Sequence, residues 1–148
     1  PPTFDAWELI IDNTAAAFSS LPPNKWTTLP GGYGTNFRYA PAVATAATRM
    51  ARWAFTVPAM GRYAISVYYK AHTDRTTTAP YAVRNAAGCI IATVPVNQQE
   101  NGLTWVDLGT FDLGPGPLAA VELTNALTKN AIAEKYVIAD AAKIVRVG

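Results

Sequence analysis

The chain has very little of the chemistry that most enzymes use. Its 148 residues include one histidine and one cysteine, and only 15% of them are charged, below the usual quarter. Cys89 alone excludes an intrachain disulfide, and because it opens an apolar run with Ile90 and Ile91, we expect it to be buried. His72 lies in a polar segment, and no G-x-S-x-G nucleophile motif accompanies it. We therefore expect no catalytic activity.

Long apolar runs and clustered charge are also absent. Nothing approaches the roughly 18 apolar residues of a membrane-spanning helix, and no basic-then-apolar signal segment is visible at the N-terminus of this sequence. The start at Pro1 fits a processed protein or a piece of a longer one. The net charge is +2 with scattered Lys and Arg, which argues against nucleic acid and membrane insertion. No Asn-x-Ser/Thr sequon occurs, which excludes N-glycosylation by the usual signal.

Turn-forming residues, by contrast, are plentiful and evenly spread. The chain has 11 prolines and 10 glycines, and half of its residues are apolar. This length allows one well-buried domain and is short for two. Pro and Gly interrupt regular secondary structure at short intervals, which favours many short strands over long helices. We expect a single all-β domain over residues 9–148, preceded by an extended arm or linker over residues 1–8.

The stretch 105–111 is the strongest candidate for a central strand. It alternates with period two, which predicts a strand. Trp105 and Phe111 fall on one face and Leu108 on the other, so both faces carry large apolar groups, as in a central strand. We therefore expect Trp105 to pack in the core, as Trp53 does. Gly109 inside the strand predicts a β-bulge or the close approach of another segment.

Other segments show the same period. Residues 62–70 alternate most clearly, with Tyr63, Ile65, Val67 and Tyr69 on an apolar face and Tyr68 on the polar one. A hairpin is expected from 81 to 96 around the turn 85–88. The alanines of 42–51 leave a helix open as an alternative. About nine to eleven strands result, which predicts a two-sheet antiparallel β-sandwich of jelly-roll type.

A series of short motifs supports a family resemblance. In order, they are Ile11-Asp12-Asn13, Trp26, Tyr33-Gly34, Trp53, Pro58, Gly61-x-Tyr63, Tyr81-x-Val83, Asn97-Gln98, Trp105-Val106-x-Leu108-Gly109-x-Phe111 and Ala139-Asp140-Ala141. Over roughly residues 9–147 the chain resembles the golvesin / xanthan-lyase carbohydrate-binding-like domain. The resemblance implies a non-catalytic β-sandwich module of secreted, extracellular bacterial proteins, with a polysaccharide or glycan as its partner.

Exposed aromatic side chains are the best candidates for holding such a glycan. Sugar rings stack on aromatic faces while nearby polar groups bind their hydroxyls. Tyr68 on the polar strand face, Tyr33 in a glycine-rich loop, Trp7 and Arg84 are the predicted carbohydrate-binding residues. For Tyr68, covering its own sheet is the alternative.

The N-terminal arm suggests a second function. Phe4, Trp7 and Leu9 could anchor the arm on an open sheet edge of another copy. Such a head-to-tail contact does not close, so it would build an extracellular fibre or surface layer. A linker without a docking role is the alternative.

Two smaller expectations concern modification and metals. Thr76, Thr77 and Thr78 precede Ala79-Pro80, a composition typical of O-glycan acceptors. The motifs predict no cofactor and no metal site. Asp12, Asn13 and Asp140 are expected to bind turn backbones, and a structural calcium held by such oxygens is compatible with the architecture, although no calcium loop is present.

Overall fold

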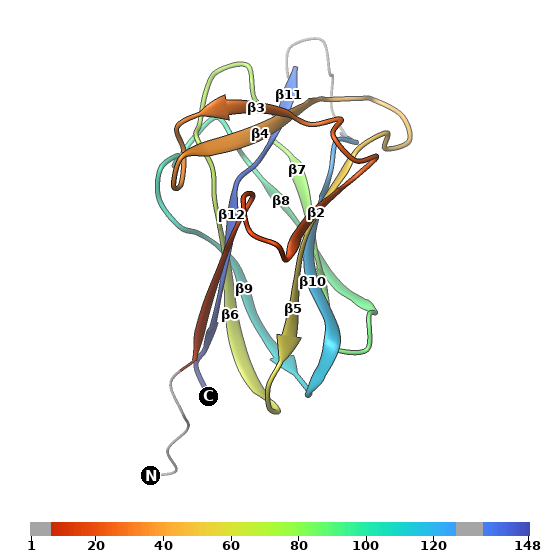
Figure 1. Cartoon of the computed structure of the whole chain (residues 1–148), viewed down its shortest axis with the longest axis vertical. Coiled ribbons are helices and arrows are strands. Elements are labelled where there is room, and N and C mark those ends of the chain that lie inside the picture. Colours follow the sequence, from red (N-terminus) through yellow and green to blue (C-terminus); the bar gives the residue numbers. More distant parts are fainter. Residues whose placement is uncertain (1–6, 127–134) are drawn as a thin grey trace.

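The fold is built from two antiparallel sheets that face each other and a smaller sheet across one end (Figure 1). The computed structural model describes residues 7–126 and 135–148. The strands of this part are β1 (Glu8–Asp12), β2 (Phe18–Leu21), β3 (Thr27–Pro30), β4 (Asn36–Pro41), β5 (Met50–Val57), β6 (Gly61–Tyr68), β7 (Ala79–Arg84), β8 (Ile90–Val96), β9 (Val106–Leu113), β10 (Gly116–Thr124), β11 (Tyr136–Ala139) and β12 (Ala141–Arg146).

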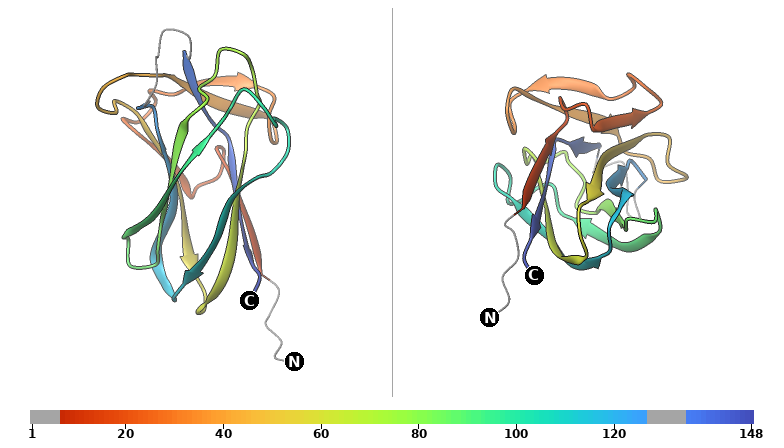
Figure 2. Two further views of the ribbon diagram at one scale, coloured as in Figure 1. Left: turned by 180° about the vertical axis from the view of Figure 1, so that it is seen from behind. Right: turned by 60° about the horizontal axis from the view of Figure 1, so that its bottom comes forward.

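The strand order confirms the predicted antiparallel sandwich. One sheet runs β1-β12-β6-β9 and the opposite one runs β2-β5-β10-β7-β8. Among the described strands of these two sheets, β7 and β8 are the one pair that follow each other in the chain and also lie side by side. They form the predicted hairpin. The third sheet, β11-β4-β3, was not predicted, and it lies across the end of the sandwich away from the C-terminus (Figures 1 and 2).

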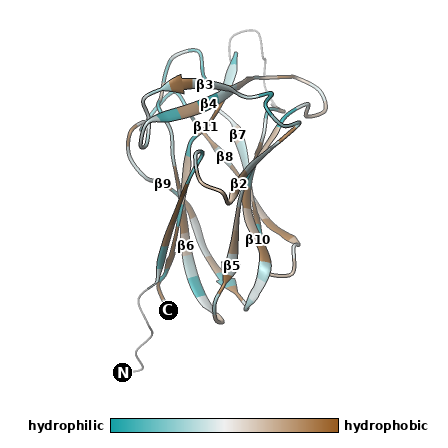
Figure 3. Ribbon diagram, viewed as in Figure 1, coloured by the Kyte–Doolittle hydropathy of each residue, from teal (hydrophilic) through white to brown (hydrophobic). Residues whose placement is uncertain are grey.

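Alternation along the strands creates the core. In β6, Tyr63, Ile65 and Val67 are fully buried, while Tyr68 points to the outer side. In β5, Trp53 is fully buried as predicted. Figure 3 shows hydrophobic and hydrophilic residues interleaved along the strands of both large sheets. Each sheet therefore has one face in the core and one outer face.

No helix forms between β4 and β5, where the alanine content left one open. The backbone N–H groups of Thr48 and Arg49 both donate to Oδ1 of Asn125 at 2.9 Å. Val43 forms an isolated bridge with Ala126. Because these long-range partners take the backbone groups, helical propensity is overridden by tertiary contacts.

The expected central strand is instead an edge strand. β9 pairs only with β6 in its sheet and ends the order β1-β12-β6-β9, so the central position was wrong. The predicted bulge is confirmed, because Ile65 pairs with Gly109 and Ser66 with Asp107, which leaves Leu108 as the extra residue. Gly109 adopts φ +137°, a conformation that side chains disfavour.

The prediction of a buried Cys89 is also wrong. Cys89 is exposed, and its N–H donates to Oδ1 of Asn85 at 3.0 Å as part of the hairpin turn. The residues that follow it, Ile90 and Ile91, are 53% and 42% exposed on β8, the edge of its sheet. An apolar run at a sheet edge does not require burial.

One fully buried amide joins the third sheet to the five-stranded sheet. Nε2 of Gln98 donates to the carbonyl of Ile138 at 2.8 Å and to the Tyr81 hydroxyl at 3.0 Å. Its Oε1 accepts the N–H of Ile138 at 2.8 Å. Gln98 thus satisfies both backbone groups of a buried residue.

We predict that Gln98→Leu destabilises the domain by about 1–3 kcal/mol, because it leaves the N–H of Ile138 buried without a partner and its C=O with only the hydrogen bond from the Tyr81 hydroxyl at 3.5 Å. Urea denaturation measures the loss. Thr93→Val on the exposed side of β8 is the control and should change the free energy of unfolding by less than about 0.5 kcal/mol. A Gln98→Leu variant as stable as the native chain would contradict the assignment.

Asp140 occupies the point where the chain passes from the third sheet into the four-stranded sheet. It lies between β11 and β12 and is fully buried. Its backbone carbonyl accepts Nε1–H of Trp53 at 3.2 Å, and its side chain is hydrogen-bonded to that of Asp12. Burial first, and then the neighbouring Asp12 carboxyl, raise the pKa of Asp140 to about 8. The protonated form of the Asp140 carboxyl is therefore favoured at pH 7.

The raised pKa of Asp140 makes the free energy of unfolding depend on pH. An unfolded Asp titrates near about 3.9, so between pH 4 and 8 the folded chain holds a proton that the unfolded chain has lost. The free energy of unfolding should therefore fall as the pH rises through this window, by on the order of a few kcal/mol. Asp140→Asn should remove this contribution, since its neutral amide offers both a donor and an acceptor.

Urea denaturation from pH 4 to 8, in the presence of a chelator so that no cation replaces the proton, tests this expectation. Asp112→Asn is the control, because Asp112 is exposed on β9 and forms only a surface ion pair with Arg62. It should leave the pH profile unchanged. Identical profiles for the Asp140→Asn variant and the native chain would show that Asp140 titrates normally.

Candidate functional site

Three aromatic side chains from distant segments meet on the outer side of the four-stranded sheet. The ring centroids of Tyr33 and Tyr68 are 5.3 Å apart, and those of Tyr33 and Trp105 and of Tyr68 and Trp105 are each 5.4 Å apart. All three side chains are half-buried. We call Tyr33, Tyr68 and Trp105 the aromatic cluster.

Strand pairing brings Tyr68 and Trp105 together. Tyr68 ends β6 and alternates outward from buried Val67. Val67 pairs with Val106, the first residue of β9, so Trp105 lies directly beside Tyr68. Because residues adjacent along a strand point to opposite faces, both rings emerge on the outer face.

Tyr33 reaches the cluster from the glycine-rich loop, which is held by Asp140. The N–H of Tyr33 donates to Oδ2 of Asp140 at 2.7 Å. A Cβ atom at Gly32 would lie 2.3 Å from the same oxygen, and Gly32 has φ +75°. The glycine therefore allows the loop to approach the carboxyl group closely enough for this hydrogen bond.

Polar and charged groups border the rings. Nζ of Lys143 on β12 lies 4.7 Å from the centroid of Trp105, a cation–π contact. Lys143 pairs with Ser66 on β6, and Ser66 pairs with Asp107 on β9, so these side chains share the outer face. The site thus combines half-buried aromatic rings with hydrogen-bond donors and acceptors, the composition that a sugar-binding surface needs.

The sequence identified part of this cluster. It named Tyr68 and Tyr33, and the structure brings them into contact. It placed Trp105 in the core, whereas the ring lies in the cluster. One sign was available, because Asp107 shares the alternating face of Trp105, and an exposed aspartate two residues away marks an outer face.

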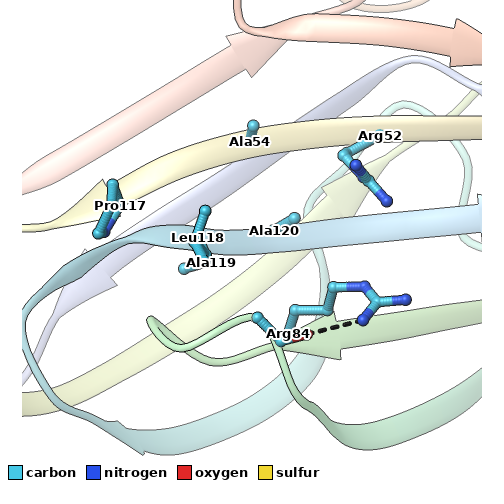
Figure 4. A pocket seen from close by; sticks show the side chains of 8 residues that line it. Arg52, Ala54, Arg84, Pro117, Leu118, Ala119 and Ala120 are labelled. Carbon is cyan, nitrogen blue, oxygen red and sulfur yellow. Dashed lines mark hydrogen bonds between the residues drawn. The ribbon is translucent and has the colours of Figure 1, made fainter.

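Arg84 does not join the cluster. It ends β7 in the five-stranded sheet (Figure 4). Its Nε donates to Oε1 of Glu122 at 2.9 Å. Tyr68 points outward from the other sheet, so the two side chains lie on opposite faces of the sandwich. If Arg84 binds a glycan, it does so on a different surface from the aromatic cluster.

The arm residues that the structure describes pack within their own domain. The Trp7 ring contacts Tyr63 edge-to-face at 5.6 Å, and its carbonyl accepts the N–H of Arg146 at 2.9 Å. Leu9 belongs to β1, which pairs with β12, so the folded domain already includes Trp7 and Glu8. Phe4 lies outside the described residues. Trp7 thus lies apart from the aromatic cluster, and docking of this arm on another copy stays a prediction.

Two of the three predicted O-glycosylation residues have hydroxyl groups enclosed in the fold. Thr76 is fully buried, and its hydroxyl accepts the N–H of Thr78 at 2.9 Å. The hydroxyl of Thr78 is buried as well. A glycosyltransferase cannot reach these two hydroxyl oxygens in the folded domain, because both are buried. The Thr/Pro-rich composition here belongs to a buried turn. O-glycosylation of Thr77, which is half-buried, stays a prediction.

Neither a metal cluster nor a membrane helix is found in the described ranges. Within residues 7–126 and 135–148, no group of three or more His, Cys, Asp or Glu side chains could hold a metal ion. Asp12 and Asp140 share a hydrogen bond, which places a proton between them, and a structural calcium stays a prediction. His72 lies in an exposed loop with Nδ1 3.1 Å from Oδ1 of Asp74. None of the described residues forms a helix with the length and apolarity that crossing a bilayer requires.

Comparison with solved structures finds the same fold in two proteins. It superposes on part of the xanthan lyase of Paenibacillus with a TM-score of 0.80 and 30% identity, covering 95% of this chain and 13% of the lyase. The C-terminal CBM6 module of LamC, a laminarinase from Zobellia galactanivorans, shares the fold with a TM-score of 0.61 and 14% identity, covering 94% of this chain and 99% of the module.

Sequence comparison agrees. Golvesin from Dictyostelium discoideum is 29% identical over 114 residues, which cover 77% of this chain and 19% of golvesin. The chain thus spans about a fifth of the length of this relative. The sequence model of the golvesin C-terminal domain matches residues 9–146, nearly the whole fold. The chain therefore belongs to the golvesin C-terminal domain family.

Proposed function

We propose that this domain is a non-catalytic carbohydrate-binding module that holds a polysaccharide on the aromatic cluster. The observation that carries the proposal is the meeting of Tyr33, Tyr68 and Trp105 on one outer face, bordered by Lys143. The likeness to a CBM6 module and to part of a xanthan lyase supports the same class of ligand.

The chemistry of the face suits an extended glycan better than a small molecule. The C–H faces of sugar rings lie against aromatic carbons, which bury large apolar areas. Lys143, Ser66 and Asp107 offer donors and acceptors to the hydroxyl groups. Several modest contacts along a chain add up to useful retention, so a polysaccharide is the fitting ligand.

The relatives suggest the setting in which the module acts. The domain corresponds to 13% of the xanthan lyase chain and 19% of golvesin. We infer that it serves a larger secreted, extracellular protein by keeping that protein at its polysaccharide. Any chemistry on the glycan would then belong to other parts of that protein.

We predict that Trp105→Ala and Tyr68→Ala each weaken polysaccharide binding at least tenfold, about 1.4 kcal/mol. Truncating a central aromatic contact typically has such an effect. Affinity gel electrophoresis against xanthan, laminarin and other soluble neutral and acidic polysaccharides measures it. The melting temperature should change little, because both rings are only half-buried on the outer face.

Thr110→Ala is the matched control, since Thr110 is exposed on β9 and pairs with Ala64 on the same sheet. It should bind like the native chain. Retention of the native chain by none of the polysaccharides would overturn the proposed function. Retention that Trp105→Ala and Tyr68→Ala leave unchanged would move the site away from the aromatic cluster.

A further inference from the structure

A hollow of about 320 Å³ opens on the outer face of the five-stranded sheet, which is the face opposite the aromatic cluster (Figure 4). Its lining includes Arg52, Ala54, Arg84, Leu118 and Ala120. The volume lies at the lower end of small-molecule sites, which span roughly 300–1,000 Å³. The hollow has room for a single sugar unit.

Small side chains on adjacent strands create the hollow. Ala120 on β10 pairs with Ala54 on β5 and with Arg84 on β7, so two methyl groups and one long side chain meet in one row. Leu118, which is 59% exposed, stands at the end of β10 as an apolar wall. The hollow therefore has an apolar half formed by Leu118 and the alanines.

The other half is cationic and held in place from within. Glu122 on β10 is nearly buried, with 5% of its side chain exposed, and it forms ion pairs with both Arg52 and Arg84. Arg84 also donates from Nη1 to the carbonyl of Gly88 at 2.7 Å. One carboxylate thus fixes two guanidinium groups from the two flanking strands.

The two arginines retain binding capacity. Each guanidinium carries five N–H donors, and the contacts to Glu122 and Gly88 occupy only part of them. The arginine side chains are 39% and 30% exposed, and with Glu122 the group has a net charge of +1. A fixed guanidinium pair beside an apolar wall matches an oxyanion attached to a less polar body.

We propose that this hollow is a second glycan site, which binds an acidic sugar unit through its carboxylate or sulfate ester. The anionic group lies against Arg52 and Arg84, and the C–H face of the ring lies on Ala120 and Leu118. The assignment to a sugar, rather than to another anion, rests on the proposed function. The site itself is independent of the aromatic cluster, because it lies on the other sheet.

NMR of the Nε–Hε groups of Arg52 and Arg84 tests the proposal directly. The protein is titrated at constant ionic strength with sodium glucuronate, glucose 6-sulfate, glucose or acetate. We expect saturable shifts with one or both acidic sugars and none with glucose. The acidic sugar that binds more tightly shows whether the site prefers a carboxylate or a sulfate ester.

Three variants separate this site from the aromatic cluster. Leu118→Glu puts a negative charge on the rim without removing a hydrogen bond of the arginines, and it should weaken acidic-sugar binding at least tenfold. Leu29→Glu makes the same change on β3, outside the hollow, and should bind like the native chain. The Trp105→Ala variant should bind the acidic sugar like the native chain, even if it no longer binds polysaccharide at the aromatic cluster.

Each contrary outcome has a definite meaning. No shift with either acidic sugar would overturn the second site and leave the aromatic cluster untouched. Equal affinity for acetate would also overturn it, since the arginines would then hold an adventitious anion only. Normal acidic-sugar binding by the Leu118→Glu variant would place the anion outside the hollow and contradict the assignment.

Discussion

The buried carboxylic acid of Asp140 is the interaction on which the architecture and the aromatic cluster both depend. It lies where the chain leaves the third sheet for the four-stranded one, and its backbone carbonyl accepts a hydrogen bond from the core residue Trp53. Its side chain accepts the N–H of Tyr33 and bonds to Asp12 on β1. The core, the N-terminal strand and the glycine-rich loop therefore meet at one buried acid, whose protonated form costs less free energy to bury than a carboxylate does.

This connection explains how an irregular loop holds the Tyr33 ring in the aromatic cluster. Loops at the end of a sandwich are usually its most variable and mobile parts. Here the glycine-rich loop is anchored at its centre, because Tyr33 donates to a buried acceptor. The Tyr33 ring also contacts Tyr68 and Trp105, and the pairing of β6 with β9 holds these two residues side by side. The cluster is thus largely preformed, which reduces the ordering cost of binding.

Period-two alternation accounts for what could be predicted from the sequence. It identified β6, most of β5 and the β7–β8 hairpin, because each buries one face and the pattern records that burial directly. Alternation carries no information about which strands become neighbours. Trp105 was therefore assigned to a central strand, although β9 lies at an edge, and the third sheet was missed because β4 pairs there with β11, nearly a hundred residues later in the chain.

The candidate residues show the same limit at the level of single side chains. Sequence could nominate Tyr33 and Tyr68 because exposed aromatics are few, but it could not tell that Thr76 is buried or that Cys89 is exposed. Burial at loops and sheet edges depends on contacts between segments far apart in the chain. Arg84 was nominated as a companion of Tyr68, whereas its side chain pairs with Glu122, 38 residues away in the chain.

The two outer faces of the sandwich differ in a way that follows from their strands. On the four-stranded sheet, large aromatic side chains cover the outer face near the third sheet, while on the five-stranded sheet alanines leave a hollow beside two arginines. A packed core separates the faces, so binding at one has no direct contact through which to alter the other. Two such sites on one rigid domain would either cross-link separate chains or require a polysaccharide to bend around the sandwich. Because the two faces point in opposite directions, cross-linking separate chains would require less deformation of a bound polysaccharide than bending one chain around the sandwich.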